Sequence, residues 1–280
     1  MRWPGAMGPS YMSRSKALAG ERTVNFYPEI AEAETPKARV ALYPCPGLTT
    51  FATLSDSPGR GIFEEDSGRL FAMFGSYLYE VDSAGTPTIR GTLAIDANPA
   101  TFATNGSDEL FITTGDTGYI LTLSTNAVTT EVTDVTMGGH VDGFFVALDA
   151  VTGTLKISES GDGTTWDAAQ VQQRSAEADP WIAMLVVRRE IYLFGNKTGE
   201  VWYNAGNSPF PFAQRSGSFF QVGIAAQWSL AQFGTSLAWL GRSARGGLAV
   251  YAMSGYTPVK ISNFGVDWVI QQYEDAGVID

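Results

Sequence analysis

A phrase of apolar residues, glycine and aromatic residues recurs along this chain with a period of about 40 residues. LFAMFGSYLYEV begins at Leu70 and LFITTGDTGYIL begins at Leu110, a separation of 110 − 70 = 40 residues. A glycine lies between two apolar runs in five such copies, at Gly75, Gly115, Gly153, Gly195 and Gly241. Because glycine adopts positive φ without a steric penalty, each copy predicts two strands joined by a tight turn.

Three or four short strands in each 40-residue unit are typical of propeller blades. We therefore predict an all-β fold, a β-propeller of about six blades. Five full units are expected near residues 61–98, 99–137, 138–178, 179–224 and 225–263. A TIM barrel would need helices of 10–15 residues between the strands. No amphipathic helix longer than two turns is expected, and DAAQVQQRSAEA, from Asp167, is the best candidate for a short one.

The two ends of the chain complete this domain plan. Residues 1–37 are predicted to form an extended arm, and residues 38–280 the propeller. FGVDWVIQQYEDAGVID, from Phe264, reads as the first strand of a further unit. Since propellers often close with an N-terminal strand, segments 38–54 and 264–280 are expected to build an incomplete or shared closing blade. A chain ending within a unit suggests truncation or a partner that covers the open edge.

The charge balance is acidic, with 18 Lys and Arg against 29 Asp and Glu and a net charge of −11. This balance argues against a protein that holds nucleic acid through phosphate contacts. It is consistent with solubility, or with a wall that does not retain passing DNA. No apolar run is long enough to span a membrane, and no signal peptide is recognised, so a soluble cytosolic product is expected. A single cysteine, Cys45, excludes an internal disulfide framework.

The stretch YLFGNKTGEVWYNAGNSPFPF, from Tyr192 to Phe212, is rich in aromatic residues. Four of its aromatic side chains are expected to pack between blades rather than to line a ligand pocket, namely Tyr192, Phe194, Trp202 and Tyr203. Pro209 and Pro211 cannot donate to a strand ladder. The segment containing them is therefore predicted to be a rigid loop at a blade rim, available for contacts.

Several phrases resemble the packaged-DNA stabilisation proteins of short-tailed phages, the tail hub or nozzle subunits. Besides Tyr192–Phe212, these phrases are NFYPE (Asn25–Glu29), YPCPGL (Tyr43–Leu48), Arg60-Gly61, SGDGTTWDAA (from Ser160) and KIS (Lys260–Ser262). Their order and spacing match the family from Asn25 to about Tyr273. Members of the family are usually longer than this chain.

The resemblance implies a structural virion protein without catalysis, cofactor or metal. Such proteins form a ring, typically a hexamer, below the portal and its adaptor ring. The ring extends the DNA channel, helps to retain the packaged genome, and carries the tail needle or tailspikes. Double-stranded DNA would pass through the lumen without specific binding. The expected location is the virion tail, after assembly in the cytoplasm of the bacterial host.

Residues of the arm and of the proline-rich loop are the predicted interaction residues, with their aromatic members as the anchors, since aromatic side chains often anchor interfaces. They are Trp3, Tyr11, Asn25, Phe26, Tyr27, Pro28 and Glu29 in the arm, and Pro209, Phe210, Pro211 and Phe212 in the loop. The arm could pack across its own propeller or onto a neighbouring subunit, and both alternatives stay open.

Two other function classes remain to be weighed. SGDGTTW resembles the Asp-box turn of sialidases, whose chemistry needs an arginine cluster and a Tyr–Glu pair. Arg188 and Arg189 are adjacent, so on a strand they would point to opposite faces. No catalytic set can be assigned to a glycosidase. A carbohydrate-binding module would expose one aromatic residue per blade, but aromatics at the repeated strand position are better explained by core packing.

The remaining candidate site residues are given structural interpretations. His140, the only histidine, is expected in a loop as a solvated or capping residue. Cys45 is expected to be buried and inert. Asp116 and Asp162 could bind calcium, but isolated carboxylates in turns are expected to be turn residues.

Overall fold

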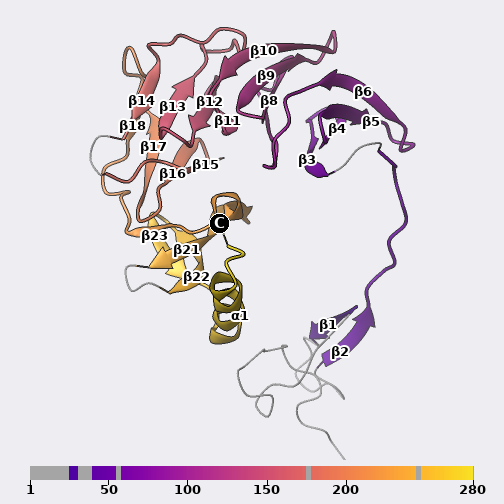
Figure 1. The fold of residues 1–280 in the computed structure, drawn as a ribbon, viewed down its shortest axis with the longest axis vertical. Helices are drawn as coiled ribbons and strands as arrows, with labels where there is room; N and C mark the ends of the chain where they lie inside the picture. The colour runs from indigo at the N-terminus through magenta and orange to yellow at the C-terminus, as the bar shows by residue number, and fades with distance from the viewer. Residues whose placement is uncertain (1–24, 31–39, 55–57, 175–177, 244–246, 280) are drawn as a thin grey trace, which may run out of the picture. The chain divides into compact units, whose positions relative to one another are not determined.

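The computed structural model describes residues 25–30, 40–54, 58–174, 178–243 and 247–279 (Figure 1). The chain divides into two compact units. One comprises Met1–Thr50 with Ser262–Val278, and the other comprises Phe51–Ile261 with Ile279–Asp280.

Five antiparallel sheets follow one another along the second unit. The first sheet contains β3 (Gly59–Glu64), β4 (Leu70–Phe74), β5 (Tyr77–Val81) and β6 (Pro87–Thr92). The second contains β7 (Thr101–Thr104), β8 (Glu109–Thr114), β9 (Thr117–Thr122) and β10 (Ala127–Thr133). The third contains β11 (Met137–Val141), β12 (Phe144–Asp149), β13 (Thr154–Ile157) and β14 (Val171–Gln173).

The fourth and fifth sheets continue this pattern. The fourth contains β15 (Ala183–Val187), β16 (Glu190–Phe194), β17 (Gly199–Asn204) and β18 (Phe212–Gln214). The fifth contains β19 (Val222–Ile224), β20 (Ala231–Phe233), β21 (Ser236–Ser243), β22 (Leu248–Ser254) and β23 (Thr257–Lys260). A 3-10 turn, η1 (Gln227–Ser229), precedes β20. These meanders confirm the all-β class and the repeated four-stranded unit.

The repeated glycines have two different roles. Gly75, Gly115 and Gly153 have φ of 52°, 56° and 68°, which confirms the predicted turns. Gly241 instead lies inside β21 opposite Ala249, so the turn predicted there is wrong. A Cβ on Gly241 would lie 2.7 Å from the ring of Tyr251. Close packing, not turn geometry, therefore requires glycine at this position.

The core consists of the interfaces between successive sheets. One apolar cluster joins the first sheet to the second, a second cluster joins the second to the third, and the largest joins the third, fourth and fifth. Ile112 and Phe111 are neighbours on β8, and they belong to the clusters on opposite faces of the second sheet. This alternation follows from the two-residue period of a strand.

The Arg-Gly phrase at the start of β3 holds the connection between the first two sheets. Arg60 is buried; its Nε donates to the carbonyl of Asn98 at 2.8 Å, and its guanidinium pairs with Asp96. A Cβ on Gly61 would lie 2.7 Å from the ring of Phe102. The indole of Trp228, in η1, also donates to Asn98, at 3.3 Å. The phrase therefore packs the first sheet against the second.

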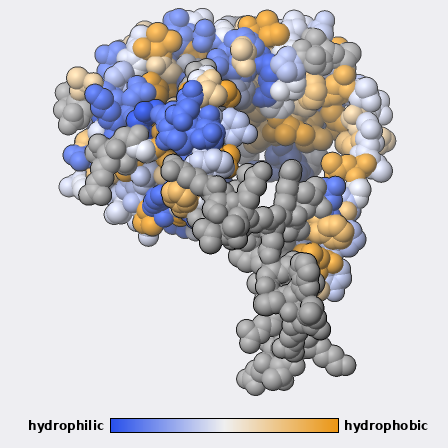
Figure 2. All heavy atoms as spheres, turned by 60° about the horizontal axis from the view of Figure 1, so that its bottom comes forward, coloured by the Kyte–Doolittle hydropathy of each residue, from blue (hydrophilic) through white to orange (hydrophobic). Residues whose placement is uncertain are grey.

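Some large apolar side chains remain outside the clusters. Ile62 is 71% exposed, and Phe233 on the fifth sheet is 60% exposed. Figure 2 shows hydrophobic side chains gathered in patches between hydrophilic ones on one face of the molecule.

The first unit contains a hairpin of β1 (Phe26–Ile30) and β2 (Val40–Pro44), and the helix α1 (Phe264–Asp275). The strand predicted from Phe264 is therefore wrong, and with it the strand that this segment would add to a closing blade. The side chain of Asn263 caps α1 by accepting from the amide of Val266. Gly277, with φ of 65°, ends the helix by donating to Glu274, while Val278 donates to Tyr273.

Apolar residues in this segment fit both a strand and a helix period over a few residues, and the caps at both ends favour the helix. The short helix predicted from Asp167 is also wrong. That segment is a turn followed by β14, whose residues pair with Thr154, Leu155 and Lys156 on β13. Among the described residues, α1 is the only α-helix, and no helix is long and apolar enough to span a membrane.

Replacing Phe111 with alanine should destabilise the second unit strongly. Phe111 is 1% exposed and packs against Phe145 and Trp166 at ring-centroid distances of 5.3 and 5.4 Å. We expect a loss of about 3–5 kcal/mol in the free energy of unfolding, measured by denaturant titration. The control Ile62→Ala removes an exposed side chain and should change it by less than about 0.5 kcal/mol. Equal losses in the two variants would contradict the assigned core.

Candidate functional site

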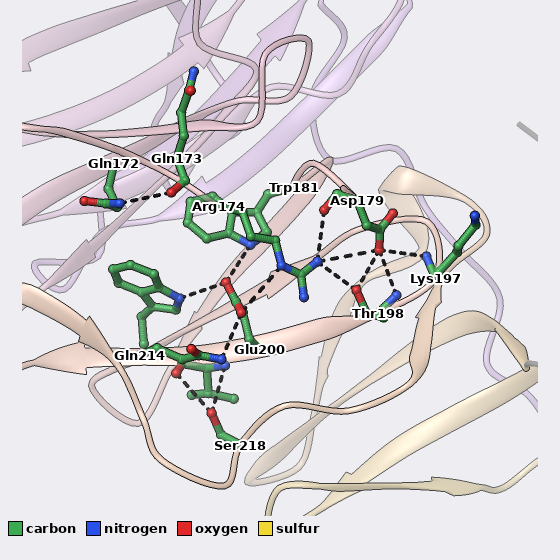
Figure 3. A network of polar contacts seen from close by, with 12 residues as sticks. Gln172, Gln173, Arg174, Asp179, Trp181, Lys197, Thr198, Glu200, Gln214 and Ser218 are labelled. Atoms are coloured by element: carbon green, nitrogen blue, oxygen red, sulfur yellow. Dashed lines mark hydrogen bonds and ion pairs between the residues drawn. The ribbon is translucent and has the colours of Figure 1, made fainter. Parts of the chain in front are cut away.

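The glycine- and aromatic-rich stretch of the fourth sheet surrounds a buried network of charged and polar side chains (Figure 3). β16 enters a turn at Gly195, and β17 leaves it at Gly199. Side chains from the segment before β15 and from the end of the third sheet point toward this turn (Figure 3). The side chains of Arg174 and Glu200 are each only 2% exposed, so the network concentrates charge away from solvent and is the first candidate site.

Asp179 organises the turn between β16 and β17. Its Oδ1 accepts from the amide of Asn196 at 2.9 Å. Its Oδ2 accepts from the amides of Lys197 and Thr198, at 3.1 and 2.9 Å, and from the Thr198 hydroxyl at 2.7 Å. A Cβ on Gly195 would lie 2.4 Å from that oxygen. The positive φ predicted for Gly195 is not found, because approach of a carboxylate is what requires glycine here.

Glu200 occupies the middle of the network and is 1% exposed. Its Oε1 accepts from the indole N–H groups of Trp181 and Trp202, at 2.9 and 3.1 Å. Its Oε2 accepts from the amide of Gln214 at 2.9 Å. Three side-chain donors therefore compensate for the removal of this carboxylate from water.

Arg174 supplies the positive charge and comes from the residue after β14, on the third sheet. Its Nη1 donates to the carbonyl of Asp179 at 2.9 Å and to the hydroxyl of Thr198 at 2.7 Å. Its guanidinium lies 3.6 Å from the carboxylates of both Asp179 and Glu200. Since its side chain is 2% exposed, these ion pairs are formed away from solvent. The network therefore links the third sheet to the fourth.

This arrangement is suited to holding the third and fourth sheets together. Each carboxylate oxygen of Asp179 and Glu200 accepts at least one hydrogen bond from the protein. Neither carboxylate is open to solvent, so neither is placed to exchange protons with a substrate. Among the described residues, no group of three or more His, Cys, Asp or Glu side chains could hold a metal ion.

A second cluster joins the fourth sheet to the fifth and contains the Tyr–Glu pair that a sialidase would need. The Glu190 carboxylate accepts from the hydroxyl of Tyr256 at 2.7 Å and from that of Tyr192 at 3.3 Å. Arg215 forms an ion pair with Glu190 at 2.6 Å, and its guanidinium lies 4.6 Å from the ring centre of Tyr203.

The electrostatics of this pair disfavour a tyrosine nucleophile. Burial raises the pKa of Tyr192 to about 12, and the Glu190 charge adds to the effect. Burial and the hydrogen bond to Glu190 raise the pKa of Tyr256 as well. An activated nucleophile requires a lowered pKa or an adjacent base that accepts its proton. Here Glu190 already compensates Arg215, so the cluster acts as a bridge between sheets.

The Asp-box-like turn is structural, as its sequence predicts. The Thr164 hydroxyl and amide donate to Asp162, at 2.6 and 2.8 Å, and these bonds lower the pKa of its carboxyl. The Trp166 indole donates to the carbonyl of Gly163 at 2.8 Å. A Cβ on Gly163 would lie 2.6 Å from Phe145 and Ile120. The turn therefore fixes Trp166 against the core between the second and third sheets.

The predicted interaction residues fall into three groups. Trp3 and Tyr11 lie outside the described residues. Asn25, with φ of 59°, precedes β1, and Phe26, Tyr27, Pro28 and Glu29 lie on it. Phe26 and Tyr27 are 48% and 49% exposed, and the ring of Tyr27 stacks on that of Tyr43 in β2. Their role in contacts stays a prediction.

The proline-rich loop is less exposed than expected. Ser208-Pro209 is a cis peptide bond, and Pro209 is exposed. Phe210, Pro211 and Phe212 are buried, and both phenylalanine rings belong to the core of the third, fourth and fifth sheets. In this chain, the loop anchors itself by these rings and presents only Pro209 of the four predicted residues.

Two further expectations are wrong. His140 lies on β11, not in a loop; it is half-buried against Phe145, and burial lowers its pKa. Cys45 is exposed, not buried. Its amide donates to the carbonyl of Asn25, which places it at the end of the β1–β2 hairpin.

Sequence reasoning missed Arg174 and Asp179. Neither residue belongs to the recurring glycine phrase, and no period connects them to Glu200. The available signal was Glu200 itself, a lone carboxylate between glycine and aromatic residues in a predicted core strand. A buried carboxylate requires a cation or several donors, but the sequence does not show which residues supply them.

A family model described as bacteriophage P22 Gp10, beta-propeller, matches residues 4–279. No curated protein sequence matches the chain. Similar solved structures include a virginiamycin B lyase from Staphylococcus aureus, at 11% identity and a TM-score of 0.49, with 87% of this chain and 80% of that one covered.

Two other similar structures match this chain over a smaller share of their own length. One is the extracellular domain of BT4673 from B. thetaiotaomicron, at 11% identity and a TM-score of 0.49, with 77% of this chain and 29% of that one covered. The other is PorZ of Porphyromonas gingivalis, at 13% identity and a TM-score of 0.46, with 82% and 31% covered. Likeness at this level carries no inference about activity.

Replacing Arg174 with methionine should leave Glu200 and Asp179 as buried charges without a cation. We expect a loss of about 3–5 kcal/mol in the free energy of unfolding, measured by denaturant titration. Adding Glu200→Gln should recover part of that loss, because it removes one uncompensated charge. The control Arg189→Met breaks an exposed, solvent-screened pair and should leave the free energy of unfolding nearly unchanged. Strictly additive effects of the Arg174 and Glu200 changes would contradict the network.

Tyr192 should remain neutral to unusually high pH. Its pKa in the fold, about 12, lies above the ordinary value of 10.0. The stabilisation by neutral Tyr192 is therefore complete below pH 10 and is lost as the pH rises from about 10 through 12. Ultraviolet difference titration of the wild type against Tyr192→Phe isolates this group. The difference between the two titrations is the signal of Tyr192. If that signal appeared near pH 10, Tyr192 would not be buried beside Glu190.

Proposed function

The chain belongs to the family of bacteriophage P22 Gp10, and we propose that it is a subunit of the tail hub or nozzle of a short-tailed phage. The family match alone supports the coarser statement that this is a structural stabilisation protein of a phage with a β-propeller fold. That match, which extends over residues 4–279, is the observation that carries the proposal.

In the proposed assembly, several copies form a ring below the portal and adaptor. A hexameric ring would extend the DNA channel, retain the packaged genome after filling, and carry needle or spike proteins at its far end. The finished location is then the tail of the virion. The phrases that resemble tail hub proteins support this placement, and they extend from Asn25 to about Tyr273.

The geometry of the polar clusters fits a load-bearing part. The network of Arg174, Asp179 and Glu200 joins the third and fourth sheets, and Glu190 with Tyr256 joins the fourth and fifth. Polar links of this kind restrain how neighbouring elements meet, most firmly where buried carboxylates are hydrogen-bonded, as at Asp179 and Glu200. A channel subunit must keep its shape against the pressure of packaged DNA, and such links serve that requirement.

The charge of the chain also fits a channel that DNA traverses. A net charge of −11 repels duplex phosphate, and 18 basic residues offer little for tight DNA binding. This supports a wall along which DNA passes without specific contacts. A glycosidase or carbohydrate-binding module finds less support, because Asp162 is engaged by its own turn and the Tyr–Glu pair has raised tyrosine pKa values.

Electron microscopy of the purified chain, with and without its portal–adaptor complex, tests this proposal. We expect rings that stack coaxially on the adaptor and leave a central channel wide enough for duplex DNA. A matched sample with an unrelated propeller protein should leave the adaptor unoccupied. Single propellers that ignore the adaptor would contradict the hub proposal, and glycan arrays and glycosidase substrates would then be the next assays.

A further inference from the structure

A two-residue turn made of Arg188 and Arg189 connects β15 to β16. The two residues have φ of 53° and 64°, so both lie in the left-handed region. They do not occupy strand positions pointing to opposite faces, as their adjacency suggested, but form the tip of a hairpin. Turns with positive φ at both positions strongly prefer Asn-Gly, Asp-Gly or Gly-Gly.

This choice of residues is unusual within the chain itself. Among the described residues, seven non-glycine residues have positive φ, and the five others are Asn25, Asp116, Asn126, Asp134 and Asp142. Asn and Asp tolerate that conformation, whereas long side chains there are strained. The corresponding turn of the third sheet uses the ordinary solution, Asp142-Gly143, between β11 and β12. Strained positions often mark functional sites.

The charges of this turn have little compensation from carboxylates of the described residues. Arg188 is exposed, and no ion pair is found for it within the described part of the chain. Arg189 pairs with Asp142 at 2.5 Å, but its side chain is 80% exposed. The adjacent Glu190 is already engaged by Arg215 and Tyr256. Two cations therefore project from a rigid hairpin of a strongly acidic protein.

A complementary acidic surface exists on the first sheet of the same chain. Glu64 ends β3 and Asp66 lies in the turn to β4; Asp82 begins the turn between β5 and β6, and all three are exposed. These turns lie at one end of the sheet, because Glu64 pairs with Leu70, Leu70 with Val81, and Val81 with Pro87. At this end of the first sheet, its first strand, β3, finishes. The arginine turn lies at the corresponding end of the fourth sheet, where β15 finishes.

We propose that the Arg188-Arg189 turn of one copy docks against the acidic turns of the first sheet, at Glu64, Asp66 and Asp82, of a second copy. The contact joins two different surfaces of the same chain, and contacts of this heterologous type generate rings when the rotation closes. This assignment rests on the proposed ring and names the surfaces that hold it together. It also explains why strained arginines stand where Asn-Gly would be more stable.

Duplex DNA is a weaker candidate for the partner of this turn. Binding to phosphate requires several cations acting together, while the acidic remainder of the chain repels the duplex. An interface between protein surfaces of opposite charge needs only a few matched pairs to steer association and fix register.

The variant Arg188→Asn/Arg189→Gly separates stability from assembly. It creates the preferred turn, so its melting temperature should rise by a few degrees while its ring formation weakens by roughly tenfold or more. Analytical ultracentrifugation measures the association constant, and wild-type association should weaken with added salt. The control Lys156→Gln/Lys197→Gln removes two positive charges elsewhere and should form rings as the wild type does.

A charge exchange completes the test. Arg188→Glu/Arg189→Glu and Glu64→Arg/Asp66→Arg should each fail to form rings alone and should associate when mixed. Rings of normal affinity from the Asn-Gly variant would overturn the contact while leaving the proposed ring intact. A monomeric wild type would overturn both. Loss of affinity for a double-stranded oligonucleotide, with ring formation unchanged, would show that the turn reads DNA instead.

Discussion

Each sheet of this chain buries an apolar face only where a neighbouring sheet covers it. The strands carry apolar side chains on both faces of the middle sheets, so these sheets depend on packing from two sides. Polar side chains then determine how neighbouring sheets meet. Arg60 joins the first sheet to the linker before the second, Arg174 joins the third to the fourth, and Glu190 joins the fourth to the fifth. The fold is thus a chain of sheet interfaces that polar and ionic contacts hold together.

The repeat made much of this architecture predictable. Glycine between two apolar runs indicated paired strands, and Gly75, Gly115 and Gly153 adopt the expected backbone. The prediction of positive φ failed at Gly195 and Gly241. At these positions glycine is required because a Cβ would collide with a neighbouring side chain, not because of the backbone conformation. It also failed at α1, because a short apolar segment fits two periods and the deciding caps, Asn263 and Gly277, lie at its ends.

The polar sites were less accessible to prediction than the strands. Asp179 and Glu200 share a network through Arg174, but these residues meet only after the sheets have packed. The burial of Phe210 and Phe212 also depends on packing between sheets. A loop with two prolines is expected to be exposed, and its sequence does not show that both rings join the core. Local patterns report strands and turns well, and contacts between units of the repeat are a property of the assembled fold.

We propose that this chain is a structural ring component of a phage tail, built from blades that polar links hold rigid. The most direct measurement is a cryo-EM reconstruction of intact virions of the phage that encodes it, with its location verified by specific antibody labelling. We expect a closed ring of propeller densities around the DNA channel, directly below the adaptor. Absence of the protein from purified virions, or its location in the capsid shell, would contradict this placement.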